Sequence, residues 1–194
     1  MTAWLQKIQQ LDAEFFLKIN GLSGSWGDYF LAWPTYFGNS LILFSVVLVY
    51  LLIWDERKFV VRNYLFVIIP ASMAGFAGHF IKHAVQRLRP YTFFRDQIVQ
   101  GKVVVNVIFG LTLSHSSFPS GHAIMVFGTA TALNLVYHNR LKFLYPLALY
   151  VSFSRIYVGA HFPSDIVGGM AVGIAASFSI FWMLKKLLPQ DLTP

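Results

Sequence analysis

The residues that could carry out chemistry gather in three stretches of this 194-residue chain. The middle stretch, Phe118-Pro-Ser-Gly-His122, directly precedes a long apolar run. Proline favours the first position of a helix, so the stretch predicts a helix that opens at Pro119. The N–H groups of Ser120 and Gly121 would then point outward at the positive end of the helix dipole, where phosphate is a usual ligand. His122 adds a side chain that can carry a proton near neutral pH. The alternative is an ordinary helix start with an incidental histidine.

The first stretch ends an apolar run with two cations, Lys82 and Arg89, followed by Pro90. If the stretch is helical, these two cations share one face about two turns apart. The alternative is that they cap a helix C-terminus and extend to the membrane surface. Arg87, between them, could help to bind a lipid head group, but extension to the membrane surface is favoured.

The third stretch combines Arg155 with His161 and Asp165. Pro163 suggests another helix start, which would put Asp165 at about the third helical position. A carboxylate there can reach back over the helix entrance, as in a capping box, and meet His161. It would hold one imidazole nitrogen and leave the other free to attack. The alternative is an ordinary N-terminal aspartate beside a surface histidine.

In chain order the three stretches are Lys-x6-Arg-Pro, Pro-Ser-Gly-His and Ser-Arg-x5-His-x3-Asp. This order resembles the tripartite signature of the type 2 phosphatidic acid phosphatase family, which also includes vanadium haloperoxidases and bacterial acid phosphatases. Every motif position between residues 82 and 165 is matched. The resemblance implies that His161 is a nucleophile that forms a phosphohistidine, that Asp165 orients it, and that His122 is the general acid and later activates water.

A phosphate ester also needs its oxygens neutralised in the transition state. The groups expected to do this are Lys82, Arg89, Ser120, Gly121 and Arg155. No metal and no other cofactor is expected, because the cations take the electrostatic role of a metal.

The composition predicts an all-α polytopic membrane helix bundle. The chain is 56% hydrophobic and 12% charged, and soluble domains carry about twice that share of charged residues. Its apolar runs approach the roughly 20 residues that span a bilayer. We expect one membrane phosphatase domain, residues 1–194, with about five transmembrane helices within residues 28–187. Residues 1–24 predict an amphipathic helix that lies in the membrane interface or packs against the bundle.

The five spans are expected near residues 28–54, 64–82 and 119–137, in a run ending near Tyr157, and at 163–184. Pro34 and Gly38 interrupt the start of the first span, whose continuous apolar part begins near Phe37. Small residues at four-residue spacing predict close packing between the spans, and they are Ala71, Ala74, Gly75, Gly78, Gly169, Gly173 and Ser177. Residues 91–118 form an active-site loop, in which residues 101–113 could be a lid, dip into the interface or simply connect.

This topology puts all three motifs on one side of the membrane. The opposite side carries the cations Arg57, Lys58, Arg62, Arg140, Lys142, Lys185 and Lys186. The positive-inside rule makes that side cytoplasmic, so the active site is expected on the periplasmic side of the inner (cytoplasmic) membrane. The net charge of +7 is explained by topology and phosphate binding. No nucleic acid and no obligatory protein partner is therefore expected.

Together these patterns predict a membrane lipid phosphatase. Undecaprenyl diphosphate, phosphatidylglycerophosphate, phosphatidate and lipid A phosphate all fit, and the sequence does not choose among them. The main alternative is a phosphotransferase that passes the phosphoryl group from His161 to a second lipid. The spanning helices disfavour a haloperoxidase, and the ordered motifs disfavour a transporter or a structural protein. His79, His83 and His115 receive no role.

Overall fold

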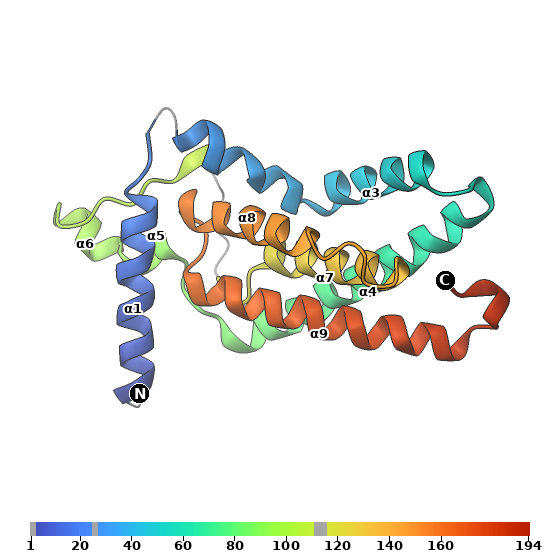
Figure 1. Ribbon diagram of the computed structural model, residues 1–194. Helices are drawn as coiled ribbons and strands as arrows, with labels where there is room; N and C mark the ends of the chain where they lie inside the picture. Colours follow the sequence, from blue (N-terminus) through green and yellow to red (C-terminus); the bar gives the residue numbers. More distant parts are fainter. Residues whose placement is uncertain (1–2, 25–26, 111–115) are drawn as a thin grey trace.

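Helices make up every regular element in the described part of the chain (Figure 1). A computed structural model describes residues 3–24, 27–110 and 116–194. The elements are α1 (Ala3–Asn20), η1 (Asp28–Ala32), η2 (Trp33–Gly38), α3 (Ser40–Trp54), α4 (Arg57–Val85), α5 (Pro90–Phe93), α6 (Arg95–Val99), η3 (Ile108–Gly110), α7 (Gly121–Val136), α8 (Leu144–Tyr157), α9 (Pro163–Leu187) and η4 (Gln190–Leu192). The all-α prediction is confirmed for these residues.

Helix α7 is the centre of the bundle, and α4, α8 and α9 pack around it (Figure 1). Twelve of its 16 residues are buried. Its sequence is compatible with this position, because a helix that is apolar on most faces lies either in a protein core or in a membrane. Since α7 begins at Gly121, within the Pro-Ser-Gly-His motif, its central place also fixes where His122 lies.

Small residues allow α9 and α4 to approach α7 closely, as the spacing predicted. A Cβ atom on Gly169 would lie 2.6 Å from the carbonyl oxygen of Ser120, and one on Gly173 would lie 2.6 Å from that of Ile124. On the other side, a Cβ on Gly78 would overlap the Ile124 side chain. Larger residues at these glycines would push the helices apart and move the motif residues that they carry.

Two helical stretches, Arg57–Val99 and Pro163–Leu187, are long and apolar enough to cross a membrane. The pair Asp28–Gly38 and Ser40–Trp54 would make a third span, bent by 82°. The bend lies where Gly38 was expected to interrupt the helix, but α3 begins at Ser40 and not near Phe37. The Asn39 side chain caps α3 by accepting from the N–H groups of Leu41 and Ile42. Helices α7 and α8 are shorter than a full span, so the count of five stays a prediction.

Helix α1 runs across one end of the bundle (Figure 1). It packs against α8 and α9, which was the second of the two alternatives for this helix. The buried stripe consists of Asp12, Phe16 and Asn20. Of the expected apolar face, Phe16 is thus buried, whereas Leu11 and Phe15 are exposed on the protein surface. Contact of that face with a membrane interface stays a prediction, as does the extent of the domain, residues 1–194.

The loop after α6 is pinned to the end of α1 by two asparagines. The Asn20 side chain donates to the carbonyl oxygen of Asn106 at 2.8 Å and accepts from its N–H at 2.8 Å. The Asn106 side chain in turn donates to the Asn20 carbonyl at 3.1 Å. This anchors the first half of the expected lid, whereas residues 111–113 and His115 lie outside the described part of the chain.

Candidate active site

The two cations of the first motif do not share a helix face. Helix α4 ends at Val85, because Gln86 takes a left-handed conformation with φ 48°, and Arg89 instead precedes α5. Both side chains still reach segments next to the motif histidines. Lys82 Nζ lies 3.3 Å from the carbonyl oxygen of Ser116, and Arg89 Nη1 donates to the carbonyl of Ala160 at 3.1 Å.

Helix α7 begins two residues later than Pro119, at Gly121. The reason is the Ser120 hydroxyl, which accepts from the N–H of Ala123 at 3.4 Å and so acts as the N-cap. The Ser120 N–H does not point outward as expected, since it donates to the Asp165 carbonyl at 3.0 Å. The first turn of α7 therefore abuts the first turn of α9, and Gly121 holds the first N–H of the helix.

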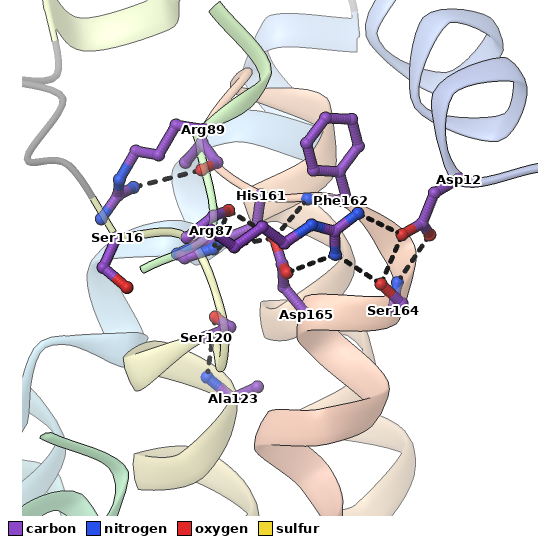
Figure 2. A network of polar contacts seen from close by, with 12 residues as sticks. Asp12, Arg87, Arg89, Ser116, Ser120, Ala123, His161, Phe162, Ser164 and Asp165 are labelled. Carbon is purple, nitrogen blue, oxygen red and sulfur yellow. Dashed lines mark hydrogen bonds and ion pairs between the residues drawn. The ribbon is translucent and has the colours of Figure 1, made fainter. Parts of the chain in front are cut away.

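His161 and Asp165 come together where the capping pattern predicted. His161 Nδ1 lies 3.5 Å from Asp165 Oδ2, and the same oxygen accepts from the Phe162 N–H at 2.8 Å. Ser117 completes the group, because its hydroxyl lies 3.4 Å from His161 Nδ1 and donates to Asp165 Oδ2. A proton on Nδ1 is therefore favoured, which leaves the lone pair on Nε2. Figure 2 shows this group beside Arg87 and Arg89.

The imidazole of His161 is buried, with an exposed fraction of 2%. Burial lowers its pKa to about 3, while the hydrogen bond and the charge of Asp165 act in the opposite direction. The positive charges of Arg89 and Arg155 also contribute to this lowering, less than burial does. His161 is thus neutral at physiological pH, which is the protonation state that a nitrogen nucleophile needs.

Arg155 brings a buried positive charge next to this imidazole. It is only 5% exposed, and its backbone carbonyl accepts from the His161 N–H at 3.2 Å. Its Nη1 donates to the Thr35 hydroxyl at 2.5 Å. Its Nε is buried and meets no acceptor among the described residues. A buried charged donor without an acceptor is costly, so this position is suited to an anionic ligand.

The imidazole of His122 faces Gly38 at the end of η2. A Cβ atom on Gly38 would overlap the His122 ring, so the glycine is needed for the close approach of this segment. Since Thr35 of η2 also contacts Arg155, the bent first span reaches two motif residues at once. Thr35, Gly38 and Ser117 were not predicted as parts of the site, and only the position of Ser117 directly before the second motif could have suggested it.

The remaining histidines of the described chain do not join the site. His79 and His83 contact each other on the exposed surface of α4, with their Nε2 atoms 3.0 Å apart. Among the described residues, no group of three or more His, Cys, Asp or Glu side chains is arranged to hold a metal ion. The expectation that the reaction needs no metal stays a prediction.

An apolar groove with a volume of about 890 Å³ lies between α3, α7 and α8 and beneath η2. On α7 it is lined by Val126, Ala130 and Leu133, which follow His122 by 4, 8 and 11 residues. These spacings put the three side chains on the same face of the helix as His122. At 1.5 Å per residue, the lined part of α7, from Val126 to Leu133, is about 10 Å long and begins about 6 Å from the histidine.

Both the sequence and the fold of this chain are similar to those of known proteins. The family model described as the PAP2 superfamily matches residues 60–189. The crystal structure of LpxE from Aquifex aeolicus is similar, with a TM-score of 0.69 and 29% sequence identity, over 89% of this chain and 95% of that one.

Two curated relatives have names that describe phosphatases. One, named lipid A 4'-phosphatase, is from Bacteroides thetaiotaomicron and is 25% identical over 94% of this chain and 81% of its own length. The other, named undecaprenyl-diphosphatase, is from Sulfolobus acidocaldarius and is 29% identical over 73% of this chain and 63% of its own length. A further match, to a protein from Bacillus licheniformis, spans only 36% of that protein.

Proposed function

Since the chain belongs to the PAP2 superfamily, we propose that it is an integral membrane phosphatase that hydrolyses a lipid phosphate or diphosphate through a phosphohistidine. The observation that carries the proposal is the buried guanidinium of Arg155, whose Nε lacks an acceptor among the described residues beside the buried nucleophile candidate His161. A phosphoryl group would supply the missing acceptor and lie within reach of the imidazole.

In the first step of the proposed reaction, His161 Nε2 attacks phosphorus in line with the leaving oxygen. The new N–P bond forms as the P–O bond to the lipid breaks, and His122 gives its proton to that oxygen. Lys82, Arg89, Arg155 and the N–H of Gly121 neutralise the charge on the equatorial oxygens. Asp165 keeps the Nδ1 proton in place while the imidazole becomes positively charged.

In the second step a water molecule attacks the phosphohistidine. His122, now neutral, accepts a proton from that water, and the N–P bond breaks. Inorganic phosphate leaves, and both histidines return to their starting protonation states. The same cations serve both steps, because each transition state carries its charge on the same three oxygens.

A lipid is the favoured substrate because the apolar groove begins about one turn along α7 from the proposed general acid, on the same face of the helix. The leaving oxygen must lie next to His122, so the lipid tail attached to it can follow Val126 and Ala130 into the groove. The names of the two curated relatives, lipid A 4'-phosphatase and undecaprenyl-diphosphatase, support the same substrate class. The choice among such lipids is left to experiment.

We expect phosphate release from long-chain lipid phosphates in the presence of EDTA, because the cations above supply the electrostatic stabilisation that a metal would provide. The measurement is inorganic phosphate released in detergent from undecaprenyl diphosphate, phosphatidylglycerophosphate, phosphatidate and lipid A, with a short water-soluble phosphate ester for comparison. Loss of activity on chelation, restored by a divalent ion, would contradict the metal-independent mechanism.

The groove offers a matched pair of variants within this experiment. Leu147 lines the groove and is 52% exposed, whereas Leu149 on the same helix is 55% exposed and does not line it. We expect Leu147→Trp to misplace the tail and lower kcat/KM for long-chain substrates by roughly 10–100-fold, with the short ester little affected. Leu149→Trp should behave as wild type. Equal effects of the two variants would remove the groove from the substrate path.

We further propose that the site faces the periplasmic side of the inner membrane. Helix α4 begins, and α9 ends, at the end of the bundle far from α1 (Figure 1). These helix ends carry Arg57, Lys58, Lys185 and Lys186, which supports a cytoplasmic location for that end.

Cysteine labelling tests this orientation directly, since the chain has no cysteine of its own. Glu56, before α4, and Gln100, after α6, are both exposed. A membrane-impermeant maleimide added to intact cells should label Gln100→Cys, after outer-membrane permeabilisation where an outer membrane is present. It should label Glu56→Cys only after the inner membrane is opened. The reverse pattern would put the site in the cytoplasm.

A further inference from the structure

Arg87 does not extend to the membrane surface, so that prediction was wrong. It occupies the turn between α4 and α5, and its side chain is 23% exposed. Its Nη1 donates to Asp165 Oδ1 at 2.7 Å and to the Ser164 hydroxyl at 2.6 Å. Its Nη2 donates to Asp12 Oδ2 at 2.6 Å. Figure 2 shows the guanidinium between the two carboxylates.

The guanidinium lies on the side of Asp165 that faces away from the nucleophile. Arg87 binds Oδ1, whereas His161 and Ser117 contact Oδ2. The guanidinium also stacks on the ring of Phe162, with 4.4 Å between Arg87 Cζ and the ring centroid. Arg87 is thus held by its partners in a position to orient Asp165, and it contacts neither the imidazole nor the open Nε of Arg155.

Asp12 ties the N-terminal helix to the same carboxylate. It is 5% exposed on α1 and accepts from the Ser164 N–H at 2.9 Å, from the Ser164 hydroxyl and from Arg87. Ser164 is the second residue of α9, so the Asp12 carboxylate lies at the N-terminus of that helix, where a negative charge is favoured. Helix α1 therefore holds the turn of α9 that carries Asp165.

We infer that Arg87 and Asp12 are positioning residues for the nucleophile. Together they fix the Asp165 carboxylate, which fixes the Nδ1 proton of His161 and so aims Nε2 at phosphorus. Helix α1 is then part of the active site as well as a surface helix. This inference rests on the proposed role of His161, and it adds two residues that lie outside the motif positions.

The test measures kcat and KM for one lipid phosphate, together with the rate of phosphoenzyme formation. We expect Arg87→Met and Asp12→Asn to lower kcat and the phosphoenzyme rate by roughly 10–100-fold, with KM changed by less than about threefold. Arg87→Lys should not restore the rate, because one ammonium group cannot bridge Asp165 and Asp12 as the planar guanidinium does. Guanidinium ion added to Arg87→Ala should recover part of the activity.

A double variant tests whether Asp12 and Arg87 act as one network or independently of each other. If Asp12 acts through Arg87, then Asp12→Asn combined with Arg87→Met should be about as slow as Arg87→Met alone. Glu14→Gln on α1 and Arg95→Met on α6 remove the same charges from exposed positions and should keep wild-type kcat. Thermal unfolding in detergent identifies any variant that is not folded, and Asp12→Asn, which is isosteric, keeps the test available if the Arg87 variants unfold.

Three results would overturn the inference: wild-type kcat in folded Arg87 and Asp12 variants, a raised KM with unchanged kcat, or additive losses in the double variant. Failure of the proposed function looks different, because the wild type itself would then release no phosphate from any lipid. In that event orthovanadate binding, measured by calorimetry, still tests the network. Orthovanadate should bind more weakly to Asp12→Asn and with unchanged affinity to Glu14→Gln. Equal affinity in the two variants would count against a positioning role for Asp12 and Arg87.

Discussion

We expect His161→Asn to abolish phosphoenzyme formation on every substrate and to lower phosphate release by more than about 10⁴-fold, because it removes the catalytic nucleophile. Asparagine is the sharper replacement than alanine, because its amide can still donate toward Asp165 from about the position of Nδ1 but offers no nucleophile at the position of Nε2. The measurement is rapid quenching with ³²P-labelled lipid phosphate, followed by detection of alkali-stable, acid-labile phosphate on the protein.

The matched control is His83→Ala, which removes a histidine from the exposed surface of α4 and should leave phosphoenzyme formation unchanged. His161 is buried, so each variant must first show a cooperative thermal transition in detergent. A folded His161→Asn protein that still traps phosphate covalently would assign the nucleophile to another residue.

His122→Ala should have an effect that depends on the leaving group. An alkyl lipid alkoxide needs a proton as it departs, and general acid catalysis is worth about 10²–10⁴-fold. A nitrophenolate leaves readily without that proton, so the loss on p-nitrophenyl phosphate should be much smaller. The comparison requires kcat/KM of the wild type and the variant on both substrates.

Comparison of His122→Ala with His161→Asn distinguishes loss of proton donation from a general loss of activity. Removal of the nucleophile should lower activity on the two substrates equally. Removal of the acid should lower activity on lipid phosphate much more than on p-nitrophenyl phosphate. Equal impairment by His122→Ala would show that its imidazole binds substrate or supports the fold and does not act as the general acid. The close contact of Gly38 with the ring makes the folding check necessary here too.

The sequence predicted the helical class, the family and the meeting of His161 with Asp165, because each depends on local spacing. A proline followed two residues later by an aspartate produces the same capping geometry in many helices, so the carboxylate could be placed before the fold was known. The break at Gly38 and the close packing at Gly169 and Gly173 were likewise local signals, and the structure confirms them.

The parts that could not be predicted depend on contacts between distant segments. Asp12 and Arg87 are 75 residues apart in sequence, and nothing in the pattern of α1 distinguishes a carboxylate that faces α9 from one that faces water. The apolar side chains of α1 were only a partial guide, because Phe16 is buried whereas Leu11 and Phe15 are exposed, and the polar Asp12 and Asn20 complete the buried stripe. Ser120 departed from expectation because its own hydroxyl capped the helix and shifted the start to Gly121.

The contacts of Asp12, Thr35 and Gly38 with the site have a consequence for chimaeric proteins. All three precede residue 60, where the match to the family model begins. A chimaera that joins the first 59 residues of one relative to the remainder of another would keep every motif and still combine unmatched partners for Arg87, Arg155 and His122. The segment that matches the family model is therefore not an exchangeable module, and grafts should move Asp12 with Arg87 and Ser164, and Gly38 with His122.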